Sequence, residues 1–250
     1  MVNFKISRDV IMASHITGVY DVNRNTILKN DDFSIVTDWA KSVSALKLQG
    51  IIFHNNFSDA TCKANESSFI KFIKVDYNSK YNPNVFRYFV YNEFIKENAQ
   101  FLNNIFFTDV SDVVVLKNPF LEPLFLNNPN AIFCGDEPKI LGNSWMQNHS
   151  EHLRNEIPNY KDFEVNFKNH KLLNCGVIGG QIILIQRFIK DLWSLHFKYN
   201  SNNTSSYTGD MGAFNYLVRT QYNENVIHGY PVNTEFKKYL DDTSCWFKHK

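Results

Sequence analysis

Two aspartates, Asp109 and Asp112, separate two short apolar runs at residues 105–107 and 113–116. Runs of this length that are rich in β-branched and aromatic residues are typical of buried strands. A carboxylate at the end of a buried strand needs a cation or strong hydrogen-bond donors, because burying it unpaired is costly. A divalent metal ion held by aspartate oxygens meets that need. The alternative is a tight turn, since aspartate and serine are common turn residues.

Two histidines are candidates for a further ligand to the same ion. His228 follows a short apolar stretch, and His249 is followed by Lys250. An imidazole beside an ammonium suits a metal-bound diphosphate, because the imidazole can bind the metal and the ammonium the phosphate. We therefore expect His249 to be the ligand, with His228 as the alternative. A single histidine is more often structural than functional.

Glycine-rich phosphate-binding motifs are absent from the sequence. Gly176, Gly179 and Gly180 do not have the spacing of a dinucleotide-binding fingerprint, and no G-x-x-x-x-G-K-[ST] motif occurs. A metal ion is therefore the remaining means by which this sequence could bind a phosphate group.

The composition excludes several classes of protein. The chain has 250 residues, 44% of them hydrophobic, which is enough for a substantial core in one domain. The formal net charge of +1 gives no electrostatic reason to expect nucleic acid or a membrane surface as a partner. The four cysteines form no C-x-x-C pair, which predicts reduced thiols and a cytoplasmic protein. Neither a signal-peptide pattern nor an apolar run near the ~20 residues of a membrane span occurs.

The order of the expected elements predicts an α/β domain with a mostly parallel sheet. Strands are expected within residues 5–16, 51–53, 69–75 and 105–107, and helices over 33–48 and 84–98. Gly50 is expected to cap the first of these helices. Strands that alternate with helices form parallel sheets with helices on their faces. Such sheets bind ligands beyond the carboxyl ends of their strands, where Asp109 and Asp112 are expected to lie.

The second half of the chain is less regular. We expect short strands at 131–134, 172–175 and 226–227, and helices at 182–198 and 210–219. Residues 142–171 are expected to be rich in loops. Because no internal repeat or linker divides the chain, we predict a single domain over residues 1–250.

Three segments together resemble the GT-A family of nucleotide-sugar-dependent glycosyltransferases. They are the strand that ends in D-x-x-D, the segment NCGVIGG at 174–180 and the segment DMGAFN at 210–215. The family motif is D-x-D, so the motif of this chain is one residue longer. The resemblance implies a Rossmann-like sheet in which about residues 1–120 bind the nucleotide sugar and about 121–250 bind the acceptor. It also implies Mn²⁺ or Mg²⁺ as the cofactor and a nucleotide-diphosphate sugar as the donor substrate.

The resemblance implies roles for individual residues as well. The implied metal ligands are Asp109, Asp112 and His249. The residues implied to bind the nucleotide and its diphosphate are Thr17, Gly18, Asp21, Arg24, Arg87, Asp109 and Lys250. Those implied to bind the acceptor are Asn174, Cys175, Gly176 and Trp145, whose indole can stack on a sugar. The candidates for a catalytic carboxylate are Asp210, Glu137 and Asp136, although Asp210 could instead cap a helix.

We therefore predict a metal-dependent glycosyltransferase that moves a sugar from a nucleotide-diphosphate sugar to a glycan or another hydroxyl acceptor. An inverting enzyme would need one of the three carboxylates as a base, whereas a retaining enzyme would not. Two alternatives stay open: a nucleotidyltransferase that makes the sugar nucleotide, and a non-catalytic carbohydrate-binding protein on a degenerate GT-A fold.

Overall fold

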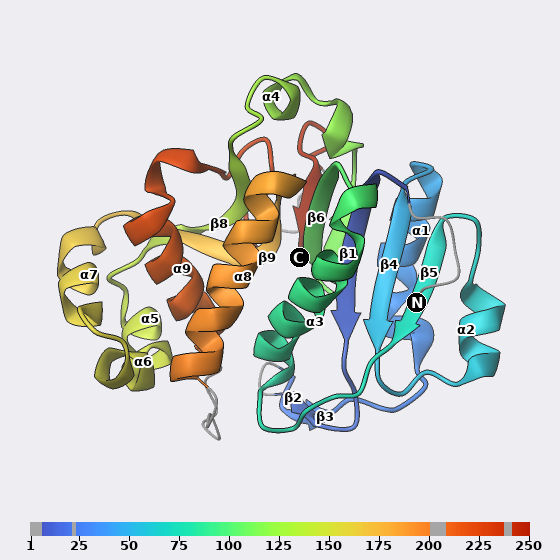
Figure 1. Ribbon diagram of the computed structural model, residues 1–250, viewed down its shortest axis with the longest axis horizontal. Helices are drawn as coiled ribbons and strands as arrows, with labels where there is room; N and C mark the ends of the chain where they lie inside the picture. The colour runs from blue at the N-terminus through green and yellow to red at the C-terminus, as the bar shows by residue number, and fades with distance from the viewer. Residues whose placement is uncertain (1–6, 22–23, 201–208, 238–241) are drawn as a thin grey trace.

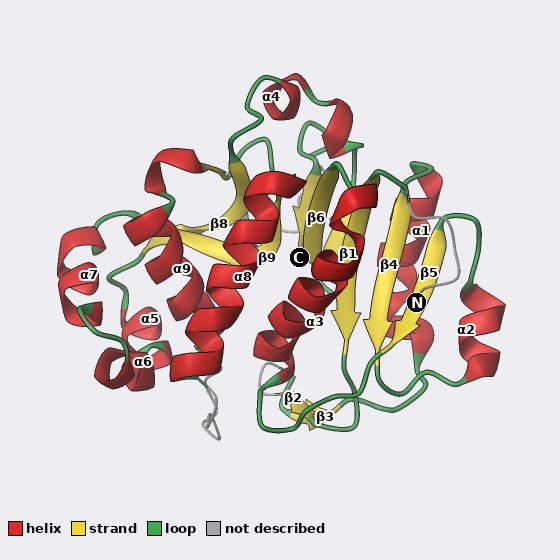
Figure 2. Cartoon of the chain, in the orientation of Figure 1, coloured by secondary structure: helices red, strands yellow, loops and turns green. Residues whose placement is uncertain are grey.

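The computed structural model describes residues 7–21, 24–200, 209–237 and 242–250. Seven strands among them form one central sheet, which Figure 2 shows in yellow. From edge to edge these strands are β10 (Val226–His228), β8 (Ile132–Ile140), β9 (Lys171–Gln181), β6 (Asn104–Asp109), β1 (Asp9–His15), β4 (Gln49–His54) and β5 (Ile70–Lys74). Two further strand pairs lie outside this sheet: β2 (Tyr20–Asp21) with β3 (Thr26–Ile27), and β7 (Val113–Val115) with β11 (Phe247–His249).

The central sheet is mostly parallel, as the sequence predicts. β1 pairs in parallel with β4 and β6, β4 with β5, and β10 with β8. β9 runs antiparallel to both of its neighbours, β6 and β8. The carboxyl ends of the parallel strands therefore share one edge of the sheet, toward which β1 and β4 point downward in Figure 1.

Helices cover both faces of the sheet. α3 (Pro83–Asn98), α8 (Ile182–Tyr199) and α9 (Asp210–Gln221) lie in front of the strands in Figure 1, and α1 (Thr37–Ala45) lies behind them. The shorter helices are α2 (Asp59–Asn65), α4 (Pro123–Leu126), α5 (Ser144–His149), α6 (Glu151–Glu156) and α7 (Tyr160–Phe167). Successive residues of a strand enter opposite cores: Val10 and Met12 of β1 pack on the side of α3, and Ile11 and Ala13 on the side of α1.

Two predictions for the second half of the chain are wrong. Residues 142–171 hold the helices α5, α6 and α7 instead of mainly loops. Helices of six to eight residues show too few turns for a clear apolar period, which is why the sequence does not reveal them. β9 does not stop before its glycines but continues through Gly176, Gly179 and Gly180 to Gln181.

The predicted role of Gly50 as a helix cap is also wrong. α1 ends at Ala45, and Gly50 lies within β4. A Cβ atom at Gly50 would lie 2.9 Å from the indole of Trp39. Glycine is therefore needed here because the ring of Trp39 packs directly against the strand.

Two further expectations concern the membrane and the cysteines. Among the described residues, no helix is both long and apolar enough to cross a membrane. All four cysteines are free thiols, and Cys134, Cys175 and Cys245 are buried. The prediction of unpaired cysteines is thus confirmed.

Gly179→Ala should destabilise the fold, because β9 passes closely over β6 at this residue. A Cβ atom at Gly179 would lie 2.6 Å from the backbone oxygen of Ile105 and against the ring of Phe106. This clash can be relieved only if the backbone moves. Overpacking of this kind costs about 1–3 kcal/mol. We expect the free energy of unfolding, measured by urea titration, to fall by that amount.

Gly135→Ala is the matched control for this measurement. A Cβ atom at Gly135 would meet its nearest neighbours at 3.5 Å, which is an ordinary contact. This variant should change the free energy of unfolding by less than about 1 kcal/mol, because alanine fits the backbone there without a clash. Equal losses in the two variants would contradict this explanation of the packing of β9 on β6.

Candidate active site

The D-x-x-D segment lies at the carboxyl edge of the sheet. Asp109 is the last residue of β6, and the chain then turns through residues 110–112 into β7. β11 pairs with β7, and His249 lies opposite Val113 in this register. The pairing of β7 with β11 therefore brings His249 beside Asp109, although the two residues are remote in sequence.

Arg87 is a buried cation at the centre of the site. It lies in the second turn of α3 and is 8% exposed. Its guanidinium forms ion pairs with the carboxylate of Asp109 and, at 3.4 Å, with that of Asp210. Burial alone would lower the pKa of Arg87, but Tyr88 and the two aspartates raise that pKa well above its usual value. The buried Arg87 is thus paired with one carboxylate from β6 and one from α9.

Asp210 is held by protein groups on both of its oxygens. Its Oδ2 lies 3.4 Å from Arg87 Nη2 and 3.6 Å from Cys175 Sγ, and its Oδ1 lies 3.3 Å from His149 Nε2. Burial raises the pKa of the Cys175 thiol well above its usual value, so this neighbour is uncharged. Gly209 occupies the N-cap position of α9, and Asp210 is the first helical residue. Asp210 is therefore not the cap, but its charge is favourable in the first turn.

Asp109 and His249 face each other across Gly176. Asp109 Oδ2 lies 3.8 Å from His249 Nε2, while Asp109 Oδ1 pairs with Arg87. A Cβ atom at Gly176 would lie 2.7 Å from Asp109 Oδ2 and 2.8 Å from His249 Nε2, so no larger residue fits beside the pair. Burial lowers the pKa of His249, against the opposing effect of Asp109. The lowered pKa favours the neutral imidazole, which is the form that binds metal ions.

Asp112 lies apart from this pair, at the surface. Its side chain is 43% exposed, and its Oδ1 accepts a hydrogen bond from Arg24 Nη2 at 3.0 Å. Arg24 also pairs with Asp21 at 2.7 Å and donates to the hydroxyl of Ser111 at 2.7 Å. One guanidinium thus ties the loop that follows β1 to the D-x-x-D turn. Exposed ion pairs contribute at most about 1 kcal/mol each, so this tie can be exchanged for another partner.

Two of the three predicted metal ligands, Asp109 and His249, lie close enough together to share a divalent ion. Two ligands of one ion lie no farther apart than twice the metal–ligand distance of about 2.1 Å. The 3.8 Å between Asp109 Oδ2 and His249 Nε2 is within this limit. Asp112 would have to turn away from Arg24 to join them. Over the ranges that the structure describes, no group of three or more histidine, cysteine or acidic side chains is arranged to hold a metal.

Lys250 and His228 have other partners. Lys250 Nζ pairs with Asp38 of α1 at 2.7 Å, and the backbone N–H of Lys250 donates to the carbonyl oxygen of Asp112 at 2.8 Å. His228 ends the edge strand β10, where its Nδ1 lies 2.9 Å from Asp136 Oδ2. Lys250 is therefore adjacent to the D-x-x-D turn, whereas His228 is paired with a predicted catalytic carboxylate.

Side-chain amides hold the loop that carries Thr17 and Gly18. The N–H of Thr17 donates to Asn55 Oδ1 at 3.0 Å, and the hydroxyl of Thr17 donates to Asn30 Oδ1 at 3.1 Å. Gly18 has φ +76°, in the left-handed region that favours glycine. These contacts fix the loop at the carboxyl ends of β1 and β4.

Two buried histidines close these same strands, and sequence reasoning missed them. His15 and His54 are register partners at the ends of β1 and β4. Burial lowers the pKa of each to about 4, so both rings are neutral near pH 7. The ring of Phe57 stacks on His15 with centroids 5.1 Å apart. The loop at Thr17 therefore begins beside uncharged aromatic groups.

Asn174 links Gly176 to Glu137, one of the predicted catalytic carboxylates. Its Nδ2 donates to Glu137 Oε1 at 3.0 Å, and its Oδ1 accepts from the N–H of Gly176 at 2.6 Å. Glu137 is 5% exposed, whereas the side chain of Asp136 is 19% exposed. Asp136 is thus the most accessible of the three predicted catalytic carboxylates.

Trp145 and His149 form a stacked pair on α5. Their ring centroids lie 4.6 Å apart with an interplanar angle of 26°. Trp145 is 39% exposed, while His149 is 5% exposed and faces Asp210. Sequence reasoning missed His149, because no motif surrounds it and its partner Asp210 is distant along the chain. This pair connects an exposed indole to the buried centre of the site.

Comparison with known proteins agrees with the observed fold. No family model and no curated protein matches the sequence. Among solved structures, the chain is similar to the galactosyltransferase LgtC, solved in complex with donor and acceptor sugar analogs, with a TM-score of 0.53 and 16% sequence identity. The match covers 96% of this chain and 86% of that chain. The predicted fold class is therefore confirmed: the chain has the mostly parallel, helix-flanked sheet of a GT-A enzyme.

Proposed function

We propose that the chain is a metal-dependent glycosyltransferase that moves a sugar from a nucleotide-diphosphate sugar to a hydroxyl acceptor. The observation that carries the proposal is the pair Asp109 and His249, which face each other 3.8 Å apart beside the buried Arg87. The similarity of the fold to that of a galactosyltransferase supports sugar transfer as the class of reaction. Because one fold can host many functions, the site carries more weight here than the fold.

Asp109 and His249 would hold Mn²⁺ or Mg²⁺ at the carboxyl edge of the sheet. Arg87 fixes one oxygen of Asp109, which leaves the other oxygen turned toward His249. A bound divalent cation would offset the negative charge that the diphosphate gains as the bond from its oxygen to C1 of the sugar breaks. Asp112 would become a third ligand by leaving Arg24.

The cations around the D-x-x-D turn would bind the diphosphate. Arg24, once separated from Asp112, has a planar guanidinium that suits phosphate oxygens, and Asp21 would keep it in place. Lys250 lies beside the same turn and would supply an ammonium. The loop at Thr17 and Gly18 would contact the nucleoside. About residues 1–120 would thus form most of the donor half, with β11 added from the second half.

The acceptor would lie against α5, β8 and β9, in the half formed by about residues 121–250. Asn174 would orient the acceptor together with Gly176, and Asp136 or Glu137 would face its hydroxyl. Asp210 is enclosed by Arg87 and His149, so we assign it a positioning role. It holds Arg87 in place, and through Arg87 it holds Asp109.

Asp112→Asn tests whether the D-x-x-D motif serves the reaction. We expect the metal-dependent release of nucleoside diphosphate from a panel of nucleotide sugars to fall by at least about 100-fold, since even supporting residues of a metal site cost 10- to 100-fold. The free energy of unfolding should change by less than about 1 kcal/mol, because Asp112 is paired only at the surface.

Asp162→Asn is the control, because Asp162 is an exposed aspartate in α7, outside the site. It should keep full activity. Wild-type rates in Asp112→Asn with Mn²⁺ present would remove Asp112 from the proposed mechanism.

His249→Ala and His228→Ala together test the choice of histidine. Calorimetric titration with nucleoside diphosphates in Mn²⁺ should show affinity reduced by about tenfold or more in His249→Ala, because a metal ligand is lost. His228→Ala should bind like the wild type, since His228 faces Asp136. In the presence of EDTA, the two variants should bind equally. Loss of metal-dependent affinity in His228→Ala alone would show that His228 is the ligand.

A further inference from the structure

A hollow of about 460 Å³ lies at the end of β8 and the start of β9, in the half that we propose binds the acceptor. It is lined by Pro138, Lys139, Ile140, Asn143 and Lys171. The hollow is shallow and open, so it would border a ligand on one side and would not enclose it. The hollow lies where the sheet ends, at the point where Ile140, the last residue of β8, pairs with Lys171, the first residue of β9. The segment after β8 then stays against this end, with the N–H of Leu141 donating to the carbonyl oxygen of His170.

The charged groups on this hollow are cationic. Lys139 and Lys171 are both exposed, and they stand at its rim together with the amide of Asn143. Lys139 Nζ lies 3.7 Å from Glu137 Oε2, but Glu137 is buried and also accepts a hydrogen bond from Asn174. The buried carboxylate of Glu137 therefore fixes the position of the Lys139 ammonium but leaves the ammonium exposed to solvent. The hollow therefore favours an anionic group over a neutral one.

An aromatic platform stands next to the two lysines. Lys139 Nζ lies 5.8 Å from the ring centroid of Trp145, so this ammonium borders both the hollow and the indole. His149 supports the ring of Trp145 from one side and contacts Asp210 with its Nε2. An indole that is 39% exposed, with an ammonium over its ring, matches a saccharide that bears a negative charge.

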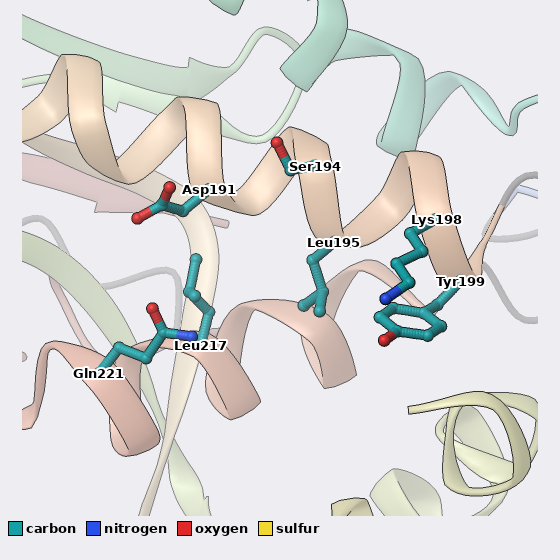
Figure 3. Close-up of a pocket in the computed structure, with 7 residues that line it drawn as sticks. All are labelled: Asp191, Ser194, Leu195, Lys198, Tyr199, Leu217 and Gln221. Carbon is teal, nitrogen blue, oxygen red and sulfur yellow. The ribbon is translucent and has the colours of Figure 1, made fainter. Parts of the chain in front are cut away.

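A second hollow shows that this charge pattern is not general. It has about 280 Å³ and lies between α8 and α9, as Figure 3 shows. Its lining includes one acidic and one basic side chain, Asp191 and Lys198. This hollow therefore predicts no preferred sign of charge. Lys198 Nζ lies 4.8 Å from the ring centroid of Tyr199, so it is also a lysine beside an aromatic ring, but it lines the second hollow.

We propose that the acceptor is an anionic saccharide whose negative group binds between Lys139 and Lys171 while one of its sugar rings lies against Trp145. This inference rests on the proposed function, because it names the class of the acceptor. It also explains the link from Trp145 through His149 to Asp210, which connects the platform to the centre of the site.

Two oligosaccharides of equal length test the preference without a donor. Calorimetric titration at low salt compares hyaluronan tetrasaccharide, which carries uronates, with neutral N-acetylchitotetraose. We expect the wild type to bind the acidic saccharide about five- to tenfold more tightly, the range for two partly exposed ion pairs. The double variant Lys139→Gln/Lys171→Gln should lose this preference, and Lys198→Gln should keep it. Trp145→Ala should weaken the binding of both saccharides.

Three results would overturn the proposal: equal binding of the two saccharides by the wild type, an unchanged preference in the double variant, or binding of inorganic phosphate as tight as that of the tetrasaccharide. Metal-dependent binding of nucleoside diphosphates, measured on the same proteins, reports on the proposed function separately. The double variant should retain it fully. Absence of diphosphate binding in the wild type would count against glycosyl transfer, whereas the two saccharides alone decide the inference about charge.

Discussion

The buried charge of Arg87 is the constraint on which the rest of the site depends. A guanidinium that is 8% exposed is stable only beside carboxylates, because an unpaired buried charge is strongly destabilising. Its partners come from two other elements, Asp109 at the end of β6 and Asp210 at the start of α9. The three can meet only when α3 and α9 have packed on the sheet. The same ion pairs therefore join the helices to the sheet and set the direction of the Asp109 carboxylate.

From Arg87 the contacts extend in two directions. Asp109 turns its second oxygen toward His249, with Gly176 leaving the necessary space. Asp210 turns its second oxygen toward His149, which stacks on Trp145. The proposed donor and acceptor halves thus share one electrostatic centre. Trp145 is therefore connected to the proposed metal site by a short series of direct side-chain contacts.

Much of the fold could be predicted from the sequence, and less of the site. The strands of the first half, the amphipathic helices and the D-x-x-D turn have local patterns, and the structure places them in the expected order. The helices within residues 142–171 could not be predicted, because they are too short to show an apolar period. The prediction for Gly50 is wrong because glycine is required there by packing against the ring of Trp39, and the sequence pattern does not reveal this tertiary contact. The sequence does not indicate a role for His149 either, because its place in the site depends on the tertiary contact with Asp210.

Binding of Mn²⁺ measured by electron paramagnetic resonance tests the central claim most directly, because the signal of free Mn²⁺ disappears when the ion is bound. With a nucleoside diphosphate from a panel of UDP, GDP, CDP and ADP, and after subtraction of the signal lost to the diphosphate alone, the wild type should bind one Mn²⁺ per chain. Asp109→Asn keeps the shape of the side chain but removes its charge, so it should weaken this binding by about tenfold or more. Binding in Asp109→Asn as tight as in the wild type would contradict the account.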